Sequence, residues 1–230
     1  MKTALLVIST GDKYAQYIDP LLQSAEKFLF PHDPILWTSS PAYHTNWQLR
    51  RYPGLGYPGE TLHRYHRFLE QHNLLSEYDF LIYTDVDMRF VAPIKEEEII
   101  SNGITATEHP GYVGLNGTPE KNPASAAYCP VLRNYFCGGF NAGTTESFLK
   151  MSETIAAAVD EDTKNGIKAV WNDESHLNRY LYDNPPAKIL SPSYCYPESE
   201  YKASGYYGAI WRSCGRTDIT PKLLALDKVK

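Results

Sequence analysis

The chain has 230 residues and a net charge of −5, from 22 Lys and Arg against 27 Asp and Glu, which fits one domain with a full hydrophobic core. It carries no basic stripe, so nucleic acid is excluded as a partner. The mean hydropathy is −0.42, and no apolar run approaches the roughly 18 residues that a transmembrane segment needs.

The expected location follows from the first residues and from the cysteines. Residues 1–8 are too short for a signal peptide and predict the first strand instead. Four cysteines lack the spacing of metal ligands and are expected to be reduced thiols: Cys129, Cys137, Cys195 and Cys214. We therefore expect a cytoplasmic protein, either free or peripheral at the inner surface of the membrane.

Strands and helices are expected to alternate along the chain. Runs of apolar and β-branched residues predict strands at residues 5–9, 34–38, 78–84, 103–108 and 187–190. Helical spacing of apolar residues predicts helices at residues 14–30, 61–75, 94–100, 145–160 and 173–182. This order predicts an α/β fold: a mixed, mainly parallel sheet flanked by helices, in a single domain over residues 1–230.

Two places interrupt this order. Asp19-Pro20 is expected to restart the helix of residues 14–30, with Asp19 as N-cap and Pro20 at the first helical position. Residues 51–60 contain three Gly and two Pro, which predicts a loop, and a mobile one. Residues 110–135 are rich in turn formers and are expected to be irregular.

The pair Asp85 and Asp87 directly follows the predicted strand of residues 78–84. Unpaired carboxylates are too costly to bury, so the two acids are expected at the carboxyl-end mouth of the sheet, where open α/β sheets bind ligands. They could be ordinary surface turn residues. Their place at the end of a buried strand favours a site for a divalent cation, and a cation indicates a phosphate group.

A second acidic segment opens the predicted helix of residues 173–182. Asn172 is expected as its N-cap, and acids in the first turn suit the helix dipole. Glu174 falls on the same stripe as Leu177 and Leu181, so its carboxylate is expected at the rim of the core rather than on the solvent face. Asp173 could be only a capping acid.

Other features allow two interpretations each. The glycines of residues 136–143 either make tight turns or let a ligand approach the backbone. His109 is either a structural hydrogen-bonding group or a functional one. Tyr14, after the first strand, either belongs to the core or stacks on a base.

Together these segments resemble the family 6 glycosyltransferases, the histo-blood group A and B transferases and α1,3-galactosyltransferase. The matching segments occur in the family's order: Ala25–Lys27, Asp85–Met88, His109–Tyr112, Tyr135–Phe140, Gly166–Asn178 and Ser191-Pro192. The resemblance is to a short member of bacterial or phage type that retains the D-x-D motif. It implies a GT-A fold, a UDP-sugar donor, Mn²⁺ (with Mg²⁺ as the alternative), and retaining α1,3 transfer to a galactoside, with fucosylated galactosides among the acceptors considered.

The resemblance also implies roles for the acids. Asp85 and Asp87 would hold the metal against the diphosphate. Glu174 matches the acid beneath the anomeric carbon, where it would form a covalent intermediate or stabilise the cation electrostatically. Asp173 matches the neighbouring acid that binds the donor sugar.

Donor-binding positions are implied at the end of the first strand and beyond. They are Ser9, Thr10, Tyr14, which matches the uridine-contacting tyrosine, and Lys222, which resembles the lysine that reaches the phosphates. The family's donor-binding arginine is assigned to Arg64, with Arg67 as the alternative.

Specificity positions follow from the same resemblance. Cys137, Gly138 and Gly139 match donor-binding positions, of which Cys137 and Gly139 tune the substituent at C2. The small Gly139 leaves room for an acetamido group, so UDP-GalNAc and UDP-Gal both fit. The implied acceptor-binding residues are His109, Tyr112 and Trp171.

The chain also departs from the family. Asn172 replaces the usual histidine, Asp19-Pro20 breaks a helix that the family leaves unbroken, and the membrane anchor and stem of the animal enzymes are not seen. Residues 51–60 and about 216–230 are expected to close over the site as lids. The competing interpretation is a non-catalytic or degenerate protein that binds nucleotide sugars or glycans with the same fold.

Overall fold

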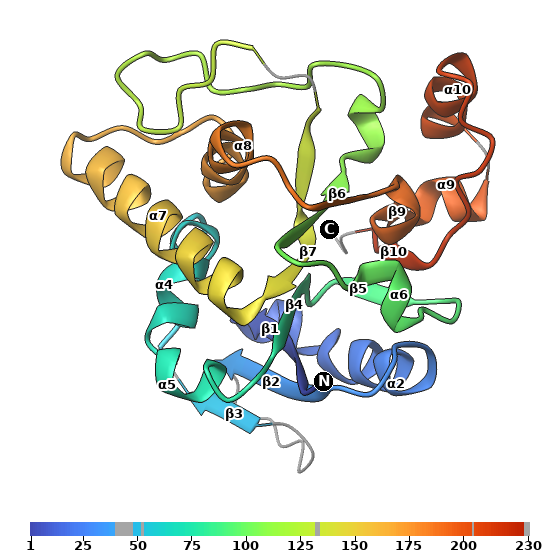
Figure 1. Cartoon of the computed structure of the whole chain (residues 1–230), viewed down its shortest axis with the longest axis horizontal. Coiled ribbons are helices and arrows are strands. Elements are labelled where there is room, and N and C mark those ends of the chain that lie inside the picture. The colour runs from blue at the N-terminus through green and yellow to red at the C-terminus, as the bar shows by residue number, and fades with distance from the viewer. Residues whose placement is uncertain (40–47, 52, 132–133, 204, 228–230) are drawn as a thin grey trace.

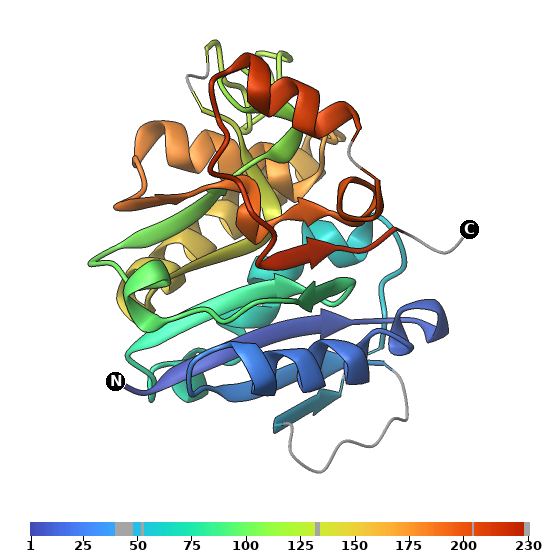
Figure 2. The same cartoon turned by 90° about the vertical axis from the view of Figure 1, so that its right-hand side faces the viewer.

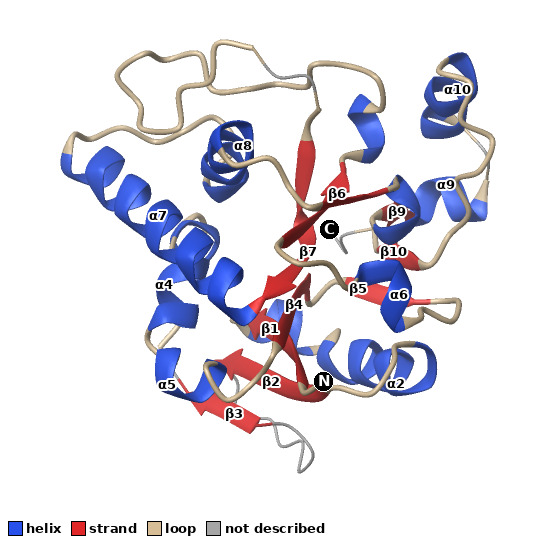
Figure 3. Cartoon of the chain, in the orientation of Figure 1, coloured by secondary structure: helices blue, strands red, loops and turns tan. Residues whose placement is uncertain are grey.

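A computed structural model describes the chain except for residues 40–47, 52, 132–133, 204 and 228–230. Its centre is a seven-stranded sheet with helices on both faces (Figures 1 and 3). Among the described residues, no helix has the length and apolarity needed to cross a bilayer.

The large sheet is parallel except for one strand. Its strands, in spatial order, are β3 (Gln48–Arg51), β2 (Asp33–Thr38), β1 (Thr3–Ser9), β4 (Phe80–Asp85), β7 (Phe136–Thr144), β6 (Ile104–Glu108) and β8 (Lys188–Leu190). Strand β7 is antiparallel to both of its neighbours, β4 and β6. The expected mixed, mainly parallel sheet is confirmed.

A smaller sheet lies beside the first. Its strands are β5 (Met88–Phe90), β10 (Leu223–Ala225) and β9 (Tyr196–Pro197). Strand β5 follows the acids at the end of β4, and β10 pairs with it in antiparallel fashion (Figure 2). The C-terminal segment is thereby attached next to Asp87, whose carbonyl oxygen accepts a hydrogen bond from the Leu226 N–H at 2.9 Å.

The helices form the outer layers. They are α1 (Asp12–Ala15), α2 (Ile18–Phe28), α3 (Gly59–Leu62), α4 (Arg64–Leu69), α5 (His72–Leu75), α6 (Glu96–Ile99), α7 (Thr145–Lys164), α8 (Asp173–Asp183), α9 (Glu198–Lys202) and α10 (Tyr206–Ser213). Short 3₁₀ turns occur at Pro110–Tyr112 and Pro192–Tyr194. Figure 1 shows α2 and α6 on one side of the sheet and α4, α5, α7 and α8 on the other.

Both faces of the sheet are buried, and β1 shows how the sequence achieves this. Leu5 and Val7 point into the cluster packed under α2, whereas Ala4 and Leu6 point into the cluster under α4, α7 and α8. Since successive residues of a strand point to opposite faces, a strand buried on both sides needs a continuous apolar run. The run Ala4–Ile8 meets that need.

Two helix predictions are wrong in detail. The predicted helix of residues 61–75 is three short helices, because the backbone leaves the helical region at His63 (φ −100°, ψ 13°) and at Gln71 (φ −111°, ψ 24°). The helix of residues 14–30 breaks earlier than expected, at Gln16–Tyr17. Asp19 is therefore no N-cap, and Pro20 lies in the first turn of α2, where a missing N–H leaves no bond unmade.

Two further expectations are corrected. The segment of residues 136–143 is strand β7, so the tight-turn interpretation of its glycines is wrong. Asn172 stands at the N-cap position of α8, but it has a left-handed backbone (φ 51°) and its side chain caps no N–H. That side chain reaches Tyr57 instead, with a 3.2 Å hydrogen bond from Nδ2 to the tyrosine hydroxyl.

Candidate active site

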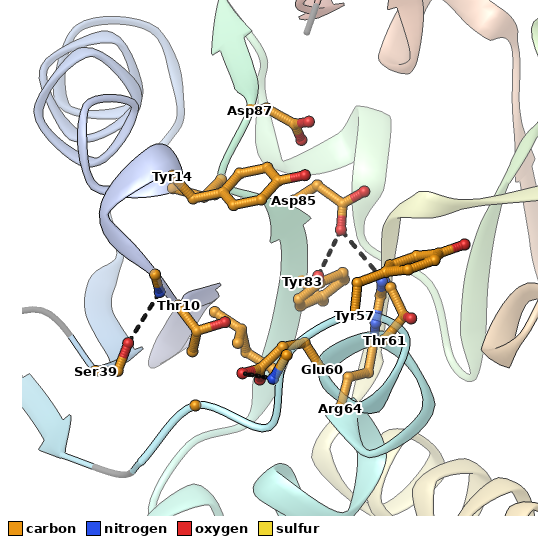
Figure 4. Close-up of a pocket in the computed structure, with 15 residues that line it drawn as sticks. Thr10, Tyr14, Ser39, Tyr57, Glu60, Thr61, Arg64, Tyr83, Asp85 and Asp87 are labelled. Atoms are coloured by element: carbon orange, nitrogen blue, oxygen red, sulfur yellow. Dashed lines mark hydrogen bonds and ion pairs between the residues drawn. The ribbon is translucent and has the colours of Figure 1, made fainter. Parts of the chain in front are cut away.

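A cavity of about 380 Å³ opens at the carboxyl ends of β1, β2 and β4. Five of the predicted site residues line it: Thr10, Tyr14, Arg64, Asp85 and Asp87. Figure 4 shows Asp85 between Tyr14 on one side and Tyr57, Thr61 and Arg64 on the other, with a dashed line from Asp85 to Arg64. The site is thus at the sheet edge where α/β proteins bind ligands.

The two aspartates lie where β4 ends at the cavity. Asp85 is the last residue of β4, and Asp87 lies in the turn that leads to β5; both line the cavity, as does Val86 between them. Asp85 Oδ1 accepts a 2.5 Å hydrogen bond from the Tyr83 hydroxyl and lies 3.4 Å from an Arg64 nitrogen. These contacts do not fit Asp85 as a plain surface residue, whereas Asp87 does lie in a turn and lines the cavity from there.

The second oxygen of Asp85 lies beside a glycine. A Cβ added to Gly139 would come within 3.2 Å of Asp85 Oδ2, so a glycine at that position leaves the carboxylate its space. Gly138, the preceding residue of β7, lies next to Glu174 in the same way, with 3.6 Å from its added Cβ to Glu174 Oε2.

Arg64 contacts both acidic segments of the site and strand β7. Its Nε lies 2.9 Å from Asp173 Oδ2, and one of its terminal nitrogens donates to the Gly138 carbonyl at 2.8 Å. The guanidinium also stacks over the Tyr83 ring, 4.6 Å from its centre. Burial opposes the charge, but Asp173 and Asp85 outweigh it and raise the pKa of Arg64. Arg67, the alternative donor-binding arginine, pairs with Glu70 and does not line the cavity.

Glu174 lies in the first turn of α8 with its carboxylate against β7. Its Oε2 accepts a 2.9 Å hydrogen bond from the Gly138 N–H. Burial raises the pKa of Glu174 to about 7, and the Gly138 N–H opposes that rise. Burial likewise raises the pKa of Asp173 to about 6 against the pull of Arg64. Two adjacent buried carboxyl groups with raised pKa values are typical of a functional site, and they lie behind Arg64 rather than in the lining of the cavity.

The predicted acceptor residues lie together, outside the lining of the cavity. The His109 and Tyr112 rings are 4.8 Å apart, and His109 Nδ1 accepts the Gly111 N–H at 3.1 Å. Burial lowers the pKa of His109 to about 4, so its ring is neutral at pH 7. Trp171 is 48% exposed, and its indole N–H donates to Thr118 at 2.7 Å.

Three predicted donor residues lie elsewhere. Lys222 pairs with Glu98 and contacts the Pro93 carbonyl, and it is not brought to the cavity. Ser9 is buried at the end of β1, just below Thr10. Cys137 is buried in the core cluster under α2. Of the two predicted lids, residue 52 and residues 228–230 lie outside the described part of the chain.

The aspartate pair fits a divalent cation that is shared with a phosphate ligand. In the part of the chain that the structure describes, no group of three or more His, Cys, Asp or Glu forms a complete metal cage. Mg²⁺-like ions use one or two carboxylates and complete their shell with substrate phosphates and water. Two carboxylates on one wall, with Gly139 leaving room beside Asp85 Oδ2, meet that requirement.

The cavity also contains residues that sequence reasoning missed. They are Ser39, Tyr57, Glu60, Thr61 and Tyr83. Tyr83 could have been found, because it lies two residues before Asp85 on the same face of a strand. The loop residues gave no such signal, since their positions depend on where the loop packs.

Sequence comparison relates this chain to known proteins. The sequence model "Glycosyltransferase family 6" matches residues 61–206. "Histo-blood group ABO system transferase 1" of Rattus norvegicus is 39% identical over 127 residues, which cover 53% of this chain and 36% of the rat protein. "Globoside alpha-1,3-N-acetylgalactosaminyltransferase 1" of Mus musculus is 30% identical over 206 residues, 81% of this chain and 58% of the mouse protein.

The fold and the site define an α/β protein with a ligand-sized cavity at the carboxyl ends of its strands. The family match covers more than half of the chain, and the chain belongs to glycosyltransferase family 6. Its mainly parallel sheet with flanking helices is consistent with a GT-A-like fold. The chain spans less than two thirds of the length of these two relatives, 36% and 58% respectively.

Proposed function

We propose that this protein is a retaining glycosyltransferase that moves galactose or N-acetylgalactosamine from a UDP-sugar to a galactoside, in α1,3 linkage and with Mn²⁺. The names of the relatives support the sugar and the linkage, because one is an alpha-1,3-N-acetylgalactosaminyltransferase and the other a blood group transferase. Gly139 has no side chain to exclude an acetamido group, so both donors fit.

One observation carries the proposal. Two neighbouring glycines of β7 separate the Asp85 carboxylate from the Glu174 carboxylate, with Gly139 beside Asp85 and Gly138 beside Glu174. A diphosphate at the aspartates would leave its attached sugar over this glycine surface, next to Glu174. No side chain of the strand stands in the way.

The residues divide the work of the first step. Tyr14 gives the wall of the cavity a flat aromatic face beside Asp85 and Asp87 (Figure 4), which suits the uracil base. Asp85 and Asp87 would hold the metal ion, which neutralises charge on the departing diphosphate. Arg64 fixes Asp85 and Asp173 in place through its buried contacts.

Glu174 is the residue that acts on the donor sugar. As a carboxylate on the face opposite UDP, it would attack the anomeric carbon or stabilise its positive charge. The acceptor hydroxyl then arrives on the face that UDP left, which gives retention. His109, Tyr112 and Trp171 supply the acceptor surface, and a neutral His109 suits hydrogen bonding to a sugar hydroxyl.

A donor panel tests the proposal. UDP release is measured for UDP-Gal, UDP-GalNAc, UDP-Glc and UDP-GlcNAc, with Mn²⁺ or with chelator, on plain and fucosylated galactosides. We expect release with UDP-Gal or UDP-GalNAc only, dependent on Mn²⁺, and an α1,3-linked product by NMR. No UDP release with any donor and acceptor, or an inverted product, would overturn it.

Two variants test the residue roles in the same assay. Glu174→Gln should lower turnover by about 10³-fold or more, because it removes the charge that faces the anomeric carbon. Asp85→Asn with Asp87→Asn should abolish the response to Mn²⁺ and the UDP-dependent thermal shift. Near-normal turnover in either variant would remove that residue from the mechanism.

A further inference from the structure

Helix α10 is attached to the 3₁₀ turn that follows β6. The indole N–H of Trp211, which is 4% exposed, donates to the Pro110 carbonyl at 2.8 Å. The Cys214 thiol donates to the Val113 carbonyl at 3.2 Å. Because Pro110 and Val113 lie at the two ends of that turn, these bonds fix α10 beside the segment that begins with His109.

One ring of this helix faces the same glycine as the His109 ring. A Cβ added to Gly111 would lie 3.4 Å from the imidazole of His109 and 3.6 Å from the ring of Tyr207, which is half-buried. The φ of Gly111 lies outside the left-handed region, so its backbone conformation is open to other residues. What the glycine provides is free space between the two rings.

The two rings offer a sugar both hydrogen bonding and an apolar face. Nδ1 of His109 accepts the Gly111 N–H at 3.1 Å, and burial lowers the pKa of this ring to about 4, so it is neutral at pH 7. Its proton is therefore on Nε2, which makes the histidine a hydrogen-bond donor. The Tyr207 ring presents a flat apolar face with a hydroxyl at its edge. This combination matches a pyranose, which has an apolar C–H face and a rim of hydroxyl groups.

Tyr207 is held in place by two buried side chains. Glu200, which is 6% exposed, accepts the Gly205 N–H at 2.7 Å and the Tyr207 N–H at 3.2 Å. The centre of the Tyr207 ring lies 6.3 Å from that of Trp211, one turn along the helix. An aromatic ring that is ordered in this way loses little conformational freedom when a ligand binds.

The residues follow the order of the strands away from the reacting centre. Glu174 lies against β7 through the Gly138 N–H, His109 follows β6, the next strand of the sheet, and Tyr207 lies on the helix attached beyond β6. A galactose that contacts His109 and directs a hydroxyl to the donor sugar at Glu174 would therefore carry its next sugar towards Tyr207.

We propose that Tyr207 and Gly111 form, with His109, a subsite for the second sugar of the acceptor, the one to which the accepting galactose is linked. The inference rests on the proposed transfer to a galactoside and adds that an oligosaccharide is preferred to a single galactose. Gly111 leaves the space for the second sugar, and the ring of Tyr207 packs against its C–H face.

The acceptor kinetics of Tyr207→Ala test the subsite. Values of kcat and KM are measured for methyl β-galactoside and for a disaccharide in which galactose is β-linked to a second sugar. For the wild type we expect a lower KM with the disaccharide. In Tyr207→Ala the disaccharide KM should rise about 3- to 10-fold, the scale of one lost ring contact, whereas kcat, the donor KM and the KM for methyl β-galactoside stay unchanged.

Gly111→Ala is an independent variant of the same subsite. Its methyl group would make ordinary contacts with both rings and would fill the space between them, so the disaccharide KM should rise several-fold in a protein that folds normally. Tyr201→Ala is the matched control, because it removes an exposed tyrosine of α9 that does not belong to the subsite. It should keep the wild-type preference for the disaccharide.

Three outcomes would overturn the inference. They are equal KM values for the two acceptors in the wild type, an unchanged preference for the disaccharide in both Tyr207→Ala and Gly111→Ala, and an equal loss with both acceptors in Tyr207→Ala, which would leave Tyr207 a packing residue. In each of these cases transfer to galactosides is still observed and the proposed function stands. No transfer by the wild type to either acceptor would instead overturn the proposed function.

Discussion

The two oxygens of Asp85 have different neighbours. Oδ1 takes the Tyr83 hydroxyl and the Arg64 charge, whereas Oδ2 lies beside Gly139. A carboxylate fixed at one oxygen and open at the other is suited to hold a cation in one position, because its side chain is ordered before the ligand arrives.

Gly139→Ala tests this division. Its methyl group would lie 3.2 Å from Asp85 Oδ2, which is tight enough to displace that oxygen. We expect the Mn²⁺ concentration for half-maximal activity to rise by about 3- to 10-fold, as for a disturbed ligand, read from metal titrations of UDP release and of the thermal shift.

Gly138→Ala is the matched control for the Mn²⁺ titration of Gly139→Ala. Its methyl group would lie at an ordinary 3.6 Å from Glu174, and its three nearest atoms belong to Glu174 and Arg64 and not to Asp85. Its Mn²⁺ requirement should match the wild type, whatever happens to turnover. Equal Mn²⁺ requirements in Gly139→Ala and wild type would contradict a metal role for Asp85 Oδ2.

At the scale of elements, the loop before α3 spans the mouth of the cavity. The Glu60 carboxylate holds this loop by accepting hydrogen bonds from the Leu55 N–H at 2.5 Å and the Gly56 N–H at 3.3 Å. Tyr57, which is 81% exposed, reaches across to Asn172, two residues before Glu174. The residue that departs from the family's usual histidine is therefore the one that meets this loop.

Tyr57→Phe should weaken the contact between this loop and Asn172, because it removes the tyrosine hydroxyl. An exposed hydrogen bond is worth roughly 0.5 to 1.5 kcal/mol, so UDP release without acceptor should increase about 2- to 10-fold relative to transfer. Tyr206→Phe, an exposed tyrosine on α10, is the control and should leave the ratio unchanged. A Tyr57→Phe protein with the wild-type ratio would show that the Tyr57–Asn172 contact does not restrain water.

Elements were predictable where one periodic pattern ran without conflict. Helices α7 and α8 and strands β1 and β4 follow from apolar spacing, and the acids after β4 follow from the cost of burying charge. The single helix expected at residues 61–75 is wrong because the backbone leaves the helical region at His63 and at Gln71, which apolar spacing does not mark. Strand β7 was missed because its glycines give no strand signal.

For the whole molecule, the sequence supplied the sheet and the acids but not the contacts between distant segments. Thr118 and Tyr57 lie in irregular segments, whose positions depend on packing against residues far along the chain. Lys222, which the resemblance assigns to the phosphates, pairs with Glu98 in the structure and does not line the cavity. Local patterns predict elements, whereas the site depends on how those elements meet.

Arg64 connects three elements that are far apart in the sequence. It comes from α4, and its guanidinium contacts Asp85 on β4, the Gly138 carbonyl on β7 and Asp173 on α8. Breaking a buried ion pair by removing one partner costs about 3 to 5 kcal/mol, because the other charge stays buried. Arg64→Met should therefore lower Tm by roughly 10 °C in a chain of this size.

The pH dependence of that loss has a definite sign. Asp173 already has a pKa of about 6, raised by burial, and removal of Arg64 raises it further. A native state that binds the proton more tightly than the unfolded state gains stability as pH falls. The deficit of Arg64→Met in thermal melts should thus be largest at pH 8 and shrink towards pH 5. Arg67→Met, one turn along the same helix, removes a pairing with Glu70 but leaves Asp173 paired with Arg64, so its deficit should show no such trend. A deficit of equal size at pH 5 and pH 8 would show that Asp173 is not the charge left unpaired.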